Sequence, residues 1–223
     1  MNKDYAAKNK QPAQPPMITG VVLAGGNSRR MGFNKALLEV GGCRLVERVV
    51  HALREAFGRV MLVANEPADY LYLGMPVVSD IFPGRGPLSG IHAALVHAGT
   101  PYVFVAACDM PLADTRLARF LAGRAHGFDV VVVREGVYLE PMFAVYSRNC
   151  LTPVEALLRR DRARVTDFFP SVRVKYIERW ELPPGIDFEG VFLNVNSPRD
   201  LERAADRIFR SRERGEEHPL KNR

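Results

Sequence analysis

The chain has 223 residues, 47% of them hydrophobic and 25% charged, which is ordinary for a soluble protein and long enough for one sizeable α/β domain. It has no apolar run of the roughly 18 residues that a membrane span needs, and its N-terminal residues lack the apolar core of a signal peptide, so we expect a cytoplasmic protein that does not contact a membrane. Its three cysteines and five histidines follow no zinc or disulfide spacing, which indicates reduced thiols.

The formal net charge of +6 indicates an anionic partner. Basic residues gather after the first predicted strand, in residues 159–164 and in the C-terminal tail, without the interleaved aromatics that stack bases. We therefore expect small anionic substrates and no nucleic acid. The arginines of residues 159–164 fit either a solvated basic face or a clamp for a terminal phosphate.

The first motif is ITGVVLAGGNSRRMGFNK at residues 18–35. Its apolar beginning predicts a buried strand, which breaks at Gly25 and Gly26. Because glycine has no Cβ, the backbone N–H groups there can approach a ligand closely, and Arg30 and Lys35 follow within one loop. This combination is typical of a polyphosphate site.

Two common phosphate loops are excluded by spacing. The Walker A loop requires Gly-Lys-Ser/Thr, whereas Lys35 stands between Asn34 and Ala36, and the glycines do not fall at G-x-G-x-x-G. A different kind of nucleotide loop remains.

The stretch resembles the signature L-A-G-G-x-x-x-R-M-G-x-x-K of the nucleotidyltransferases that activate sugars, lipids and cofactors, and within them it looks most like the molybdenum cofactor guanylyltransferase family. The resemblance implies that Lys35 and Arg30 are catalytic. The family commonly has Asp before the lysine, so Asn34 removes a negative charge beside Lys35. The residues of this stretch that the resemblance implies for GTP binding are Leu23, Ala24, Gly25, Gly26 and Lys35.

Apolar residues then recur at helical spacing from Leu45 to Phe57 and predict a helix. Residues 59–65 predict a buried strand that ends at Asn65, where ligand-facing groups lie in open α/β sheets. Asn65 is a candidate for nucleotide recognition, and equally a loop amide that caps the turn before Pro67.

A short strand leads to Asp80, and the glycine-rich loop 83–87 precedes a predicted helix over residues 88–96. A helix N-terminus presents unpaired N–H groups and a partial positive charge, which suits an anion or the edge of a base. The stretch resembles the family block D-x-x-P-G-x-G-P-L-x-G-I, whose Asp and loop line the guanine and substrate pocket. A carboxylate can accept from both N1–H and the amine of guanine; alternatively, Asp80 only shapes the loop.

The run at residues 102–107 predicts a central strand with Asp109 at its carboxyl end. A triphosphate arrives with Mg²⁺, which takes one or two carboxylates from a protein, so Asp109 is a candidate ligand. The alternative is an N-cap for a helix over residues 113–122, a role that Asp114 or Thr115 could also fill. The C-D-x-P block resembles the family motif that holds the ion, which implies a metal-binding and catalytic Asp109.

The segment YLEPMFAVY at residues 138–146 predicts a strand that contains a proline, so we expect an edge position or a bulge near Glu140. It resembles the family segment H/E-P-L-x-A-L-Y, which implies that Glu140 faces the second substrate. Other strands and helical pieces are expected at residues 129–133, 149–169 and 172–177.

The last motif is VFLNVNSPRD at residues 191–200. Ser197 as N-cap and Pro198 at the first helical position predict the start of a helix. Asn194 and Asn196 alternate, so both would face the same side of an extended segment. The resemblance to F-x-N-V-N-T-P-E-D-L implies that both contact the pterin and the catalytic cleft; the alternative is that they are turn amides.

The alternation of strands and helices predicts an α/β fold with a three-layer, Rossmann-like arrangement: a mostly parallel twisted sheet with helices on both faces. We expect a disordered extension at residues 1–16, a single nucleotidyltransferase domain at 17–210 and a charged tail at 211–223. Since the motif loops follow strand ends, they should meet at one rim.

The resemblance covers roughly residues 19–205. It implies a transfer of GMP from GTP to the phosphate of molybdopterin with Mg²⁺ and release of pyrophosphate, and it makes a helper GTPase of cofactor biosynthesis a candidate partner. The alternatives are a molybdopterin cytidylyltransferase, another NTP-dependent nucleotidyltransferase, a catalytically inactive GTP-binding regulator and, last, a nucleic-acid-binding module.

Overall fold

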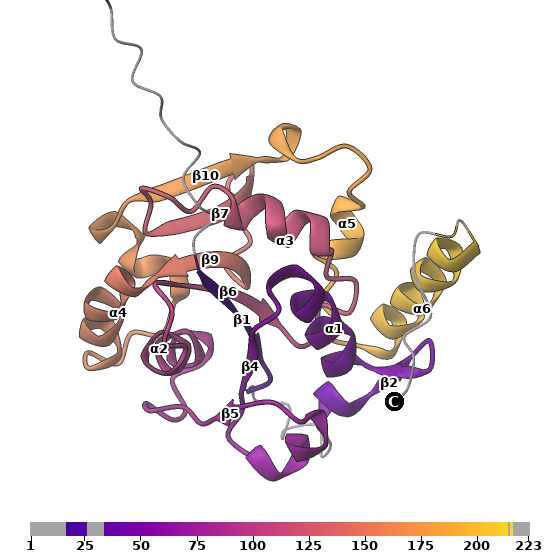
Figure 1. Ribbon diagram of the computed structural model, residues 1–223, viewed down its shortest axis with the longest axis horizontal. Coiled ribbons are helices and arrows are strands. Elements are labelled where there is room, and N and C mark those ends of the chain that lie inside the picture. The colour runs from indigo at the N-terminus through magenta and orange to yellow at the C-terminus, as the bar shows by residue number, and fades with distance from the viewer. Residues whose placement is uncertain (1–16, 26–33, 214, 216–223) are drawn as a thin grey trace, which may run out of the picture.

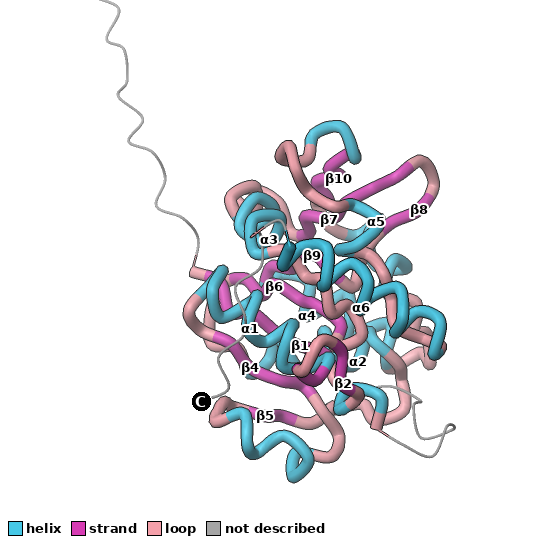
Figure 2. The backbone as a smooth tube through the Cα atoms, turned by 90° about the vertical axis from the view of Figure 1, so that its right-hand side faces the viewer, coloured by secondary structure: helices cyan, strands magenta, loops and turns pink. Residues whose placement is uncertain are grey.

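The computed structural model describes residues 17–25, 34–213 and 215. Within these residues, one sheet of eight strands has the order β10-β7-β9-β6-β1-β4-β5, and β8 pairs with β7 outside this path. Figure 2 shows β5 and β10 at opposite ends of the sheet. The strands are β1 (Ile18–Leu23), β4 (Val60–Val63), β5 (Val77–Val78), β6 (Tyr102–Ala107), β7 (Val130–Glu135), β8 (Tyr138–Leu139), β9 (Phe143–Ser147) and β10 (Val174–Glu178).

Most neighbouring strands are parallel. β1 pairs in parallel with β4 and β6, β4 with β5, and β10 with β7, whereas β9 is antiparallel to both β6 and β7. All six residues of β1 are buried, as expected for a central strand that is covered on both faces. The carboxyl ends of β1, β4, β5, β6, β7 and β10 therefore point to the same rim.

Helices cover both faces of the sheet (Figure 1). α1 (Leu45–Phe57) and α3 (Thr115–Ala122) lie on one face, and α2 (Pro87–His97) and α4 (Leu151–Leu158) lie on the other. α5 (Phe188–Val191) and α6 (Pro198–Glu213) follow near the C-terminus. This is the mostly parallel, three-layer α/β fold that the alternating pattern predicts.

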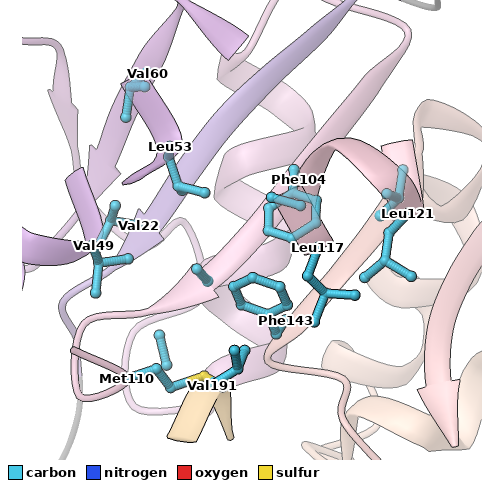
Figure 3. Close-up of a cluster of buried hydrophobic side chains, with 14 of the residues drawn as sticks. Val22, Val49, Leu53, Val60, Phe104, Met110, Leu117, Leu121, Phe143 and Val191 are labelled. Carbon is cyan, nitrogen blue, oxygen red and sulfur yellow. The ribbon is translucent and has the colours of Figure 1, made fainter. Parts of the chain in front are cut away.

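Alternating residues of the central strand enter two separate cores. Val22 packs in the cluster on the α1 and α3 face, which Figure 3 shows together with Leu53 and Phe104. Its neighbour Val21 belongs to the cluster on the α2 and α4 face, because side chains alternate along a strand. Full burial of each such side chain stabilises the fold by about 1.5–3 kcal/mol. Gly20 lets α1 approach β1 closely, since a Cβ there would lie 3.1 Å from Leu53 Cβ.

A small hairpin and α6 form a third cluster beside α1. The hairpin consists of β2 (Glu39–Val40) and β3 (Cys43–Arg44), and its Val40 packs with Leu193 and Ile208. α6 continues through Glu213, three residues beyond the expected domain boundary, and Arg212 Nη2 donates to Gly41 O at 3.0 Å. The short 3₁₀ segments are η2 (Lys35–Leu37), η3 (Pro67–Leu73), η4 (Arg148–Cys150), η5 (Val165–Ser171) and η6 (Arg179–Glu181).

The segment at residues 138–146 differs from its prediction. The structure divides it into β8 and β9, because Leu139 pairs with Arg134 and Val145 with Val131, which leaves extra residues on one side of the ladder. The expected bulge near Glu140 is therefore present. An edge position also occurs there: within the described residues β8 pairs with β7 alone, whereas β9 lies between β6 and β7.

The expected disordered extension at residues 1–16 lies outside the described residues. None of the helices in the described part of the chain is long and apolar enough to cross a membrane.

Candidate active site

A cavity of about 410 Å³ opens at the rim where the parallel strands end. Residues from six separate stretches of the sequence line it, and four of these stretches carry the motifs of the first strand, the glycine-rich loop, the C-D-x-P block and the paired asparagines. The lining includes Leu23, Ala24, Gly25, Asn34, Lys35, Asp80, Gly86, Pro87, Cys108, Asp109, Met142, Asn194 and Asn196. Gly26 and Arg30 lie outside the described residues.

Lys35 contacts two other residues that line the cavity. Its Nζ donates to Asp109 Oδ2 at 2.9 Å and to Asn196 Oδ1 at 2.7 Å. The two side chains of the ion pair are 17% and 23% exposed, so the pair is only partly screened by solvent. The ammonium group is thereby held at the cavity wall by two acceptors from other parts of the chain.

The central strands bring Lys35 and Asp109 together. Leu23 at the end of β1 pairs with Ala107 at the end of β6, and Cys108 N donates to Leu23 O at 3.0 Å. Asp109 follows directly. Its carbonyl oxygen accepts from Val195 N at 2.9 Å, which ties the asparagine segment to the same place.

Asp109 is not a helix cap. α3 begins at Thr115, two residues after the expected start, and its N-cap is Asp114, whose carboxylate accepts from Arg116 N at 2.7 Å and Leu117 N at 3.1 Å. Asp114 thus fills the capping role that the sequence left open. The carboxylate of Asp109 remains available for Lys35 and for a ligand.

The potential metal ligands at the cavity include the carboxylate of Asp109. Within residues 17–25, 34–213 and 215, no three His, Cys, Asp or Glu residues are grouped so that they could hold a metal ion. Oδ2 of the Asp109 carboxylate is paired with Lys35 Nζ. Asp109 can thus serve as one protein ligand of an ion whose other ligands are waters and substrate phosphates.

Asn65 and Asp80 form a paired contact at the ends of β4 and β5. Asn65 Nδ2 donates to Asp80 Oδ2 at 3.0 Å, and Asp80 N donates to Asn65 Oδ1 at 3.0 Å. Burial raises the pKa of Asp80, and the hydrogen bond from Asn65 partly offsets this shift. Asp80 lines the cavity, whereas Asn65 does not. The amide of Asn65 therefore orients the carboxylate of Asp80.

Glu140 lies in the bulge between β8 and β9. Burial, together with the nearby Glu135, raises the pKa of Glu140 to about 7. The cavity lining includes Met142 of the same bulge but not Glu140 itself. Glu140 is therefore two residues along the chain from a lining residue and does not line the cavity itself.

The asparagine segment follows the prediction closely. Asn194 and Asn196 both line the cavity, as expected from their alternation. α6 begins at Pro198, and Ser197 Oγ accepts from Asp200 N at 3.2 Å. Asp200 Oδ2 in turn accepts from Asn196 N at 3.1 Å, so the start of α6 fixes the segment that carries both asparagines.

Cys108 and Met142 are among the cavity residues that were not singled out from the sequence. Cys108 is half-buried, and burial of its thiol raises the pKa of that group to about 12, so it contributes a neutral thiol to the wall and not a thiolate. Met142 belongs to the bulge after β8. The C-D-x-P motif could have indicated Cys108, whereas Met142 depends on how the bulge folds.

The arginines of residues 159–164 do not line the cavity. Arg159 pairs with Glu155, and Arg162 Nη2 lies 2.7 Å from Asp167 Oδ2. These local ion pairs favour the solvated basic face over the phosphate clamp.

The rim therefore carries Gly25 after β1, a lysine held by a carboxylate, and a glycine-rich loop that leads into the N-terminus of α2. In a three-layer α/β fold, these features define a nucleotide-binding transferase of the nucleotidyltransferase type. The model of the MobA-like NTP transferase domain matches residues 20–171. The chain belongs to this family.

Relatives agree with this assignment. A protein of Pelotomaculum thermopropionicum named probable molybdenum cofactor guanylyltransferase is 47% identical over 186 residues, which cover 83% of this chain and 91% of the relative. The molybdenum cofactor guanylyltransferase of Desulfosudis oleivorans is 37% identical over 190 residues, or 84% and 94% of the two chains.

Solved structures share the fold. Molybdopterin-guanine dinucleotide biosynthesis protein A from Archaeoglobus fulgidus superposes with a TM-score of 0.73 at 26% identity and covers 86% of this chain and 99% of its own. The 4-diphosphocytidyl-2C-methyl-D-erythritol synthase of Anaerococcus prevotii, at 12% identity and a TM-score of 0.61 with 87% and 97% coverage, is similar in fold alone.

Proposed function

We propose that this protein is a molybdenum cofactor guanylyltransferase. It transfers GMP from GTP to the terminal phosphate of molybdopterin and releases pyrophosphate. The observation that carries the proposal is the contact of Lys35 with both Asp109 and Asn196 at the wall of the cavity, together with the names of the relatives.

The reaction is a displacement at phosphorus. An oxygen of the molybdopterin phosphate forms a bond to the α-phosphorus of GTP, and the bond from that phosphorus to the bridging oxygen breaks, so the electron pair leaves with pyrophosphate. The nucleophile is already ionised at neutral pH, so no general base is required. Positioning and charge balance therefore provide most of the catalysis.

Lys35 supplies a fixed positive charge for the phosphates. Its ammonium is oriented before substrate arrives, because Asp109 and Asn196 already accept its hydrogen bonds. The backbone at Ala24 and Gly25 borders the same cavity. Gly26 and Arg30 are proposed to complete this phosphate site.

Asp80 is proposed to recognise the base. Its carboxylate accepts hydrogen bonds only, and guanine presents N1–H and an exocyclic amine side by side. Cytosine offers only its amine on that edge beside an acceptor nitrogen. The contact between Asn65 and Asp80 supports this role because it fixes the direction of the carboxylate.

Mg²⁺ is the proposed metal, with Asp109 as its protein ligand. When bound, the ion would balance charge on the triphosphate. Asn194, Asn196 and Glu140 are proposed contacts of molybdopterin. A location in the cytoplasm and a helper GTPase of cofactor biosynthesis stay predictions.

The test is the Mg²⁺-dependent release of pyrophosphate in the presence of molybdopterin, with GTP compared to CTP. We expect release with GTP only, and its loss in Asp109→Ala. Asp114→Ala is the matched control, since this carboxylate caps α3 outside the cavity. Release with CTP would instead make the protein a cytidylyltransferase, and tight GTP binding without release would make it a regulator.

A further inference from the structure

Asn34 precedes Lys35 and is held by a network of its own. Its Nδ2 donates to Asp69 Oδ2 at 2.9 Å and to Tyr70 Oη at 3.0 Å. Its Oδ1 accepts from Ala36 N at 3.2 Å, which caps η2. The side chain of Asn34 thus joins the start of η2 to η3, a segment with no role in the site so far.

The orientation of the amide follows from its partners. A backbone N–H can only donate, so the atom of Asn34 that faces Ala36 must be the oxygen. The nitrogen then faces Asp69, whose carboxylate can only accept. Only an amide satisfies both neighbours, whereas a carboxylate at this position would face the carboxylate of Asp69.

Tyr70 extends the network to the other end of the phosphate-loop motif. Its ring is buried, with 1% of the residue exposed, and its Oη lies 3.3 Å from Asn34 Oδ1 and 3.5 Å from Ala24 O. Burial raises the pKa of Tyr70 to about 12, so the hydroxyl keeps its proton. Ala24 and Asn34 both line the cavity, and one hydroxyl lies within reach of both.

We propose that Asn34 is a positioning residue that Asp69 and Tyr70 hold in place, and that it fixes Lys35 for the triphosphate. Asp69 Oδ2 accepts from Asn34 Nδ2, so an amide fits at position 34 better than a second carboxylate. This inference rests on the proposed function. It adds two residues of η3 that touch no substrate themselves.

The test is a set of variants with Mg–GTP affinity and transfer kinetics as readouts. Asn34→Asp places two carboxylates in contact, so we expect about fivefold weaker binding of Mg–GTP and a lower kcat at low ionic strength. Asn34→Ala is neutral and should also weaken binding, because the amide contacts are lost. Tyr70→Phe keeps the ring and should weaken binding in the same direction.

Rescue separates geometry from charge. In Asn34→Asp/Asp69→Asn the amide and the carboxylate exchange places, and we expect affinity within about twofold of the original protein. Asn34→Asp/Glu66→Gln also removes one negative charge, but from a residue three positions before Asp69. We expect this double variant to bind Mg–GTP as weakly as Asn34→Asp.

A matched control lies at the amino end of β7, at the rim of the sheet opposite the carboxyl ends of the parallel strands. Asn149 Nδ2 donates to Oδ1 of Asp129, the residue before β7, at 2.9 Å. Asn149→Asp creates a similar repulsion there, so it should lower the melting temperature and leave Mg–GTP affinity unchanged.

The inference is overturned if Asn34→Ala and Asn34→Asp bind Mg–GTP within twofold of the original protein, or if Glu66→Gln rescues as well as Asp69→Asn. An original protein that binds no Mg–GTP would overturn the proposed function, and this inference with it. Binding of Mg–GTP without transfer to molybdopterin would contradict the proposed function alone.

Discussion

Lys35 Nζ and Asp109 Oδ2 lie 2.9 Å apart, although 74 positions separate them in the sequence. Asn196, a further acceptor of the same ammonium, is 161 positions from Lys35. The pairing of β1 with β6 explains the first contact, and the hydrogen bond from Val195 N to Asp109 O explains the second. The ammonium group of Lys35, which we propose to be catalytic, is thus oriented by contacts within the fold.

Replacement of Lys35 should remove transfer activity. Lys35→Met keeps the length of the side chain and deletes its charge, so we expect kcat/KM to fall by at least about 100-fold, as for the loss of one preorganised donor. Lys175→Met, on the edge strand β10 and away from the cavity, is the control and should keep full activity. Pyrophosphate release measures both, and unchanged activity in Lys35→Met would remove the lysine from the mechanism.

The two asparagines should differ in effect. Asn196→Ala removes an acceptor 2.7 Å from Lys35 Nζ, so we expect kcat to fall about tenfold because the ammonium is less well oriented. Asn194 instead donates to Phe192 O at 3.3 Å, so Asn194→Ala should mainly raise the KM for molybdopterin. Steady-state kinetics with each substrate varied separates the two, and equal effects on kcat would contradict this division.

Base preference should depend on Asp80. Asp80→Asn replaces one of the two acceptor oxygens of the carboxylate with an NH₂ group, which can only donate and so cannot accept from guanine. We therefore expect the ratio of kcat/KM for GTP to kcat/KM for CTP to fall by about 10- to 100-fold. Asn65→Ala should shift the ratio in the same direction but less, because Asn65 acts through Asp80. Asp167→Asn, in an ion pair with Arg162 outside the cavity, is the control. An unchanged ratio in Asp80→Asn would assign guanine recognition to another group.

Glu140 should make stability depend on pH. Its pKa is raised from 4.5 to about 7, so between these values the folded protein holds a proton that the unfolded chain has released. Its contribution to stability is therefore complete below about pH 4.5 and is lost as the pH rises through about 7. Glu140→Gln stays neutral, so its melting temperature should match that of the original protein at low pH and exceed it above pH 7.

Thermal unfolding across this pH range checks the prediction, with Glu202→Gln on the exposed side of α6 as the control. The proposed contact of Glu140 with molybdopterin adds a kinetic expectation. Glu140→Gln should raise the KM for molybdopterin and leave Mg–GTP affinity unchanged. A melting temperature that does not change relative to the original protein would mean that Glu140 is solvated.

Features that depend on neighbouring residues could be predicted from the sequence alone. The alternating apolar pattern predicted the strands and helices, because each period reflects one local geometry. The end of α1 at Gly58, with a φ of 70°, and the start of α6 after Ser197 were also readable, since turns and caps use a few residue types. The strand-end motifs therefore identified most of the cavity.

Contacts between these groups could not be predicted in the same way. The position of β9 between β6 and β7, the use of Asn65 to orient Asp80, and the contact of Asn34 with Asp69 and Tyr70 all differ from or go beyond the predictions. The physical reason is that such contacts depend on the order and register of segments far apart in the sequence, and a local pattern carries no information about either.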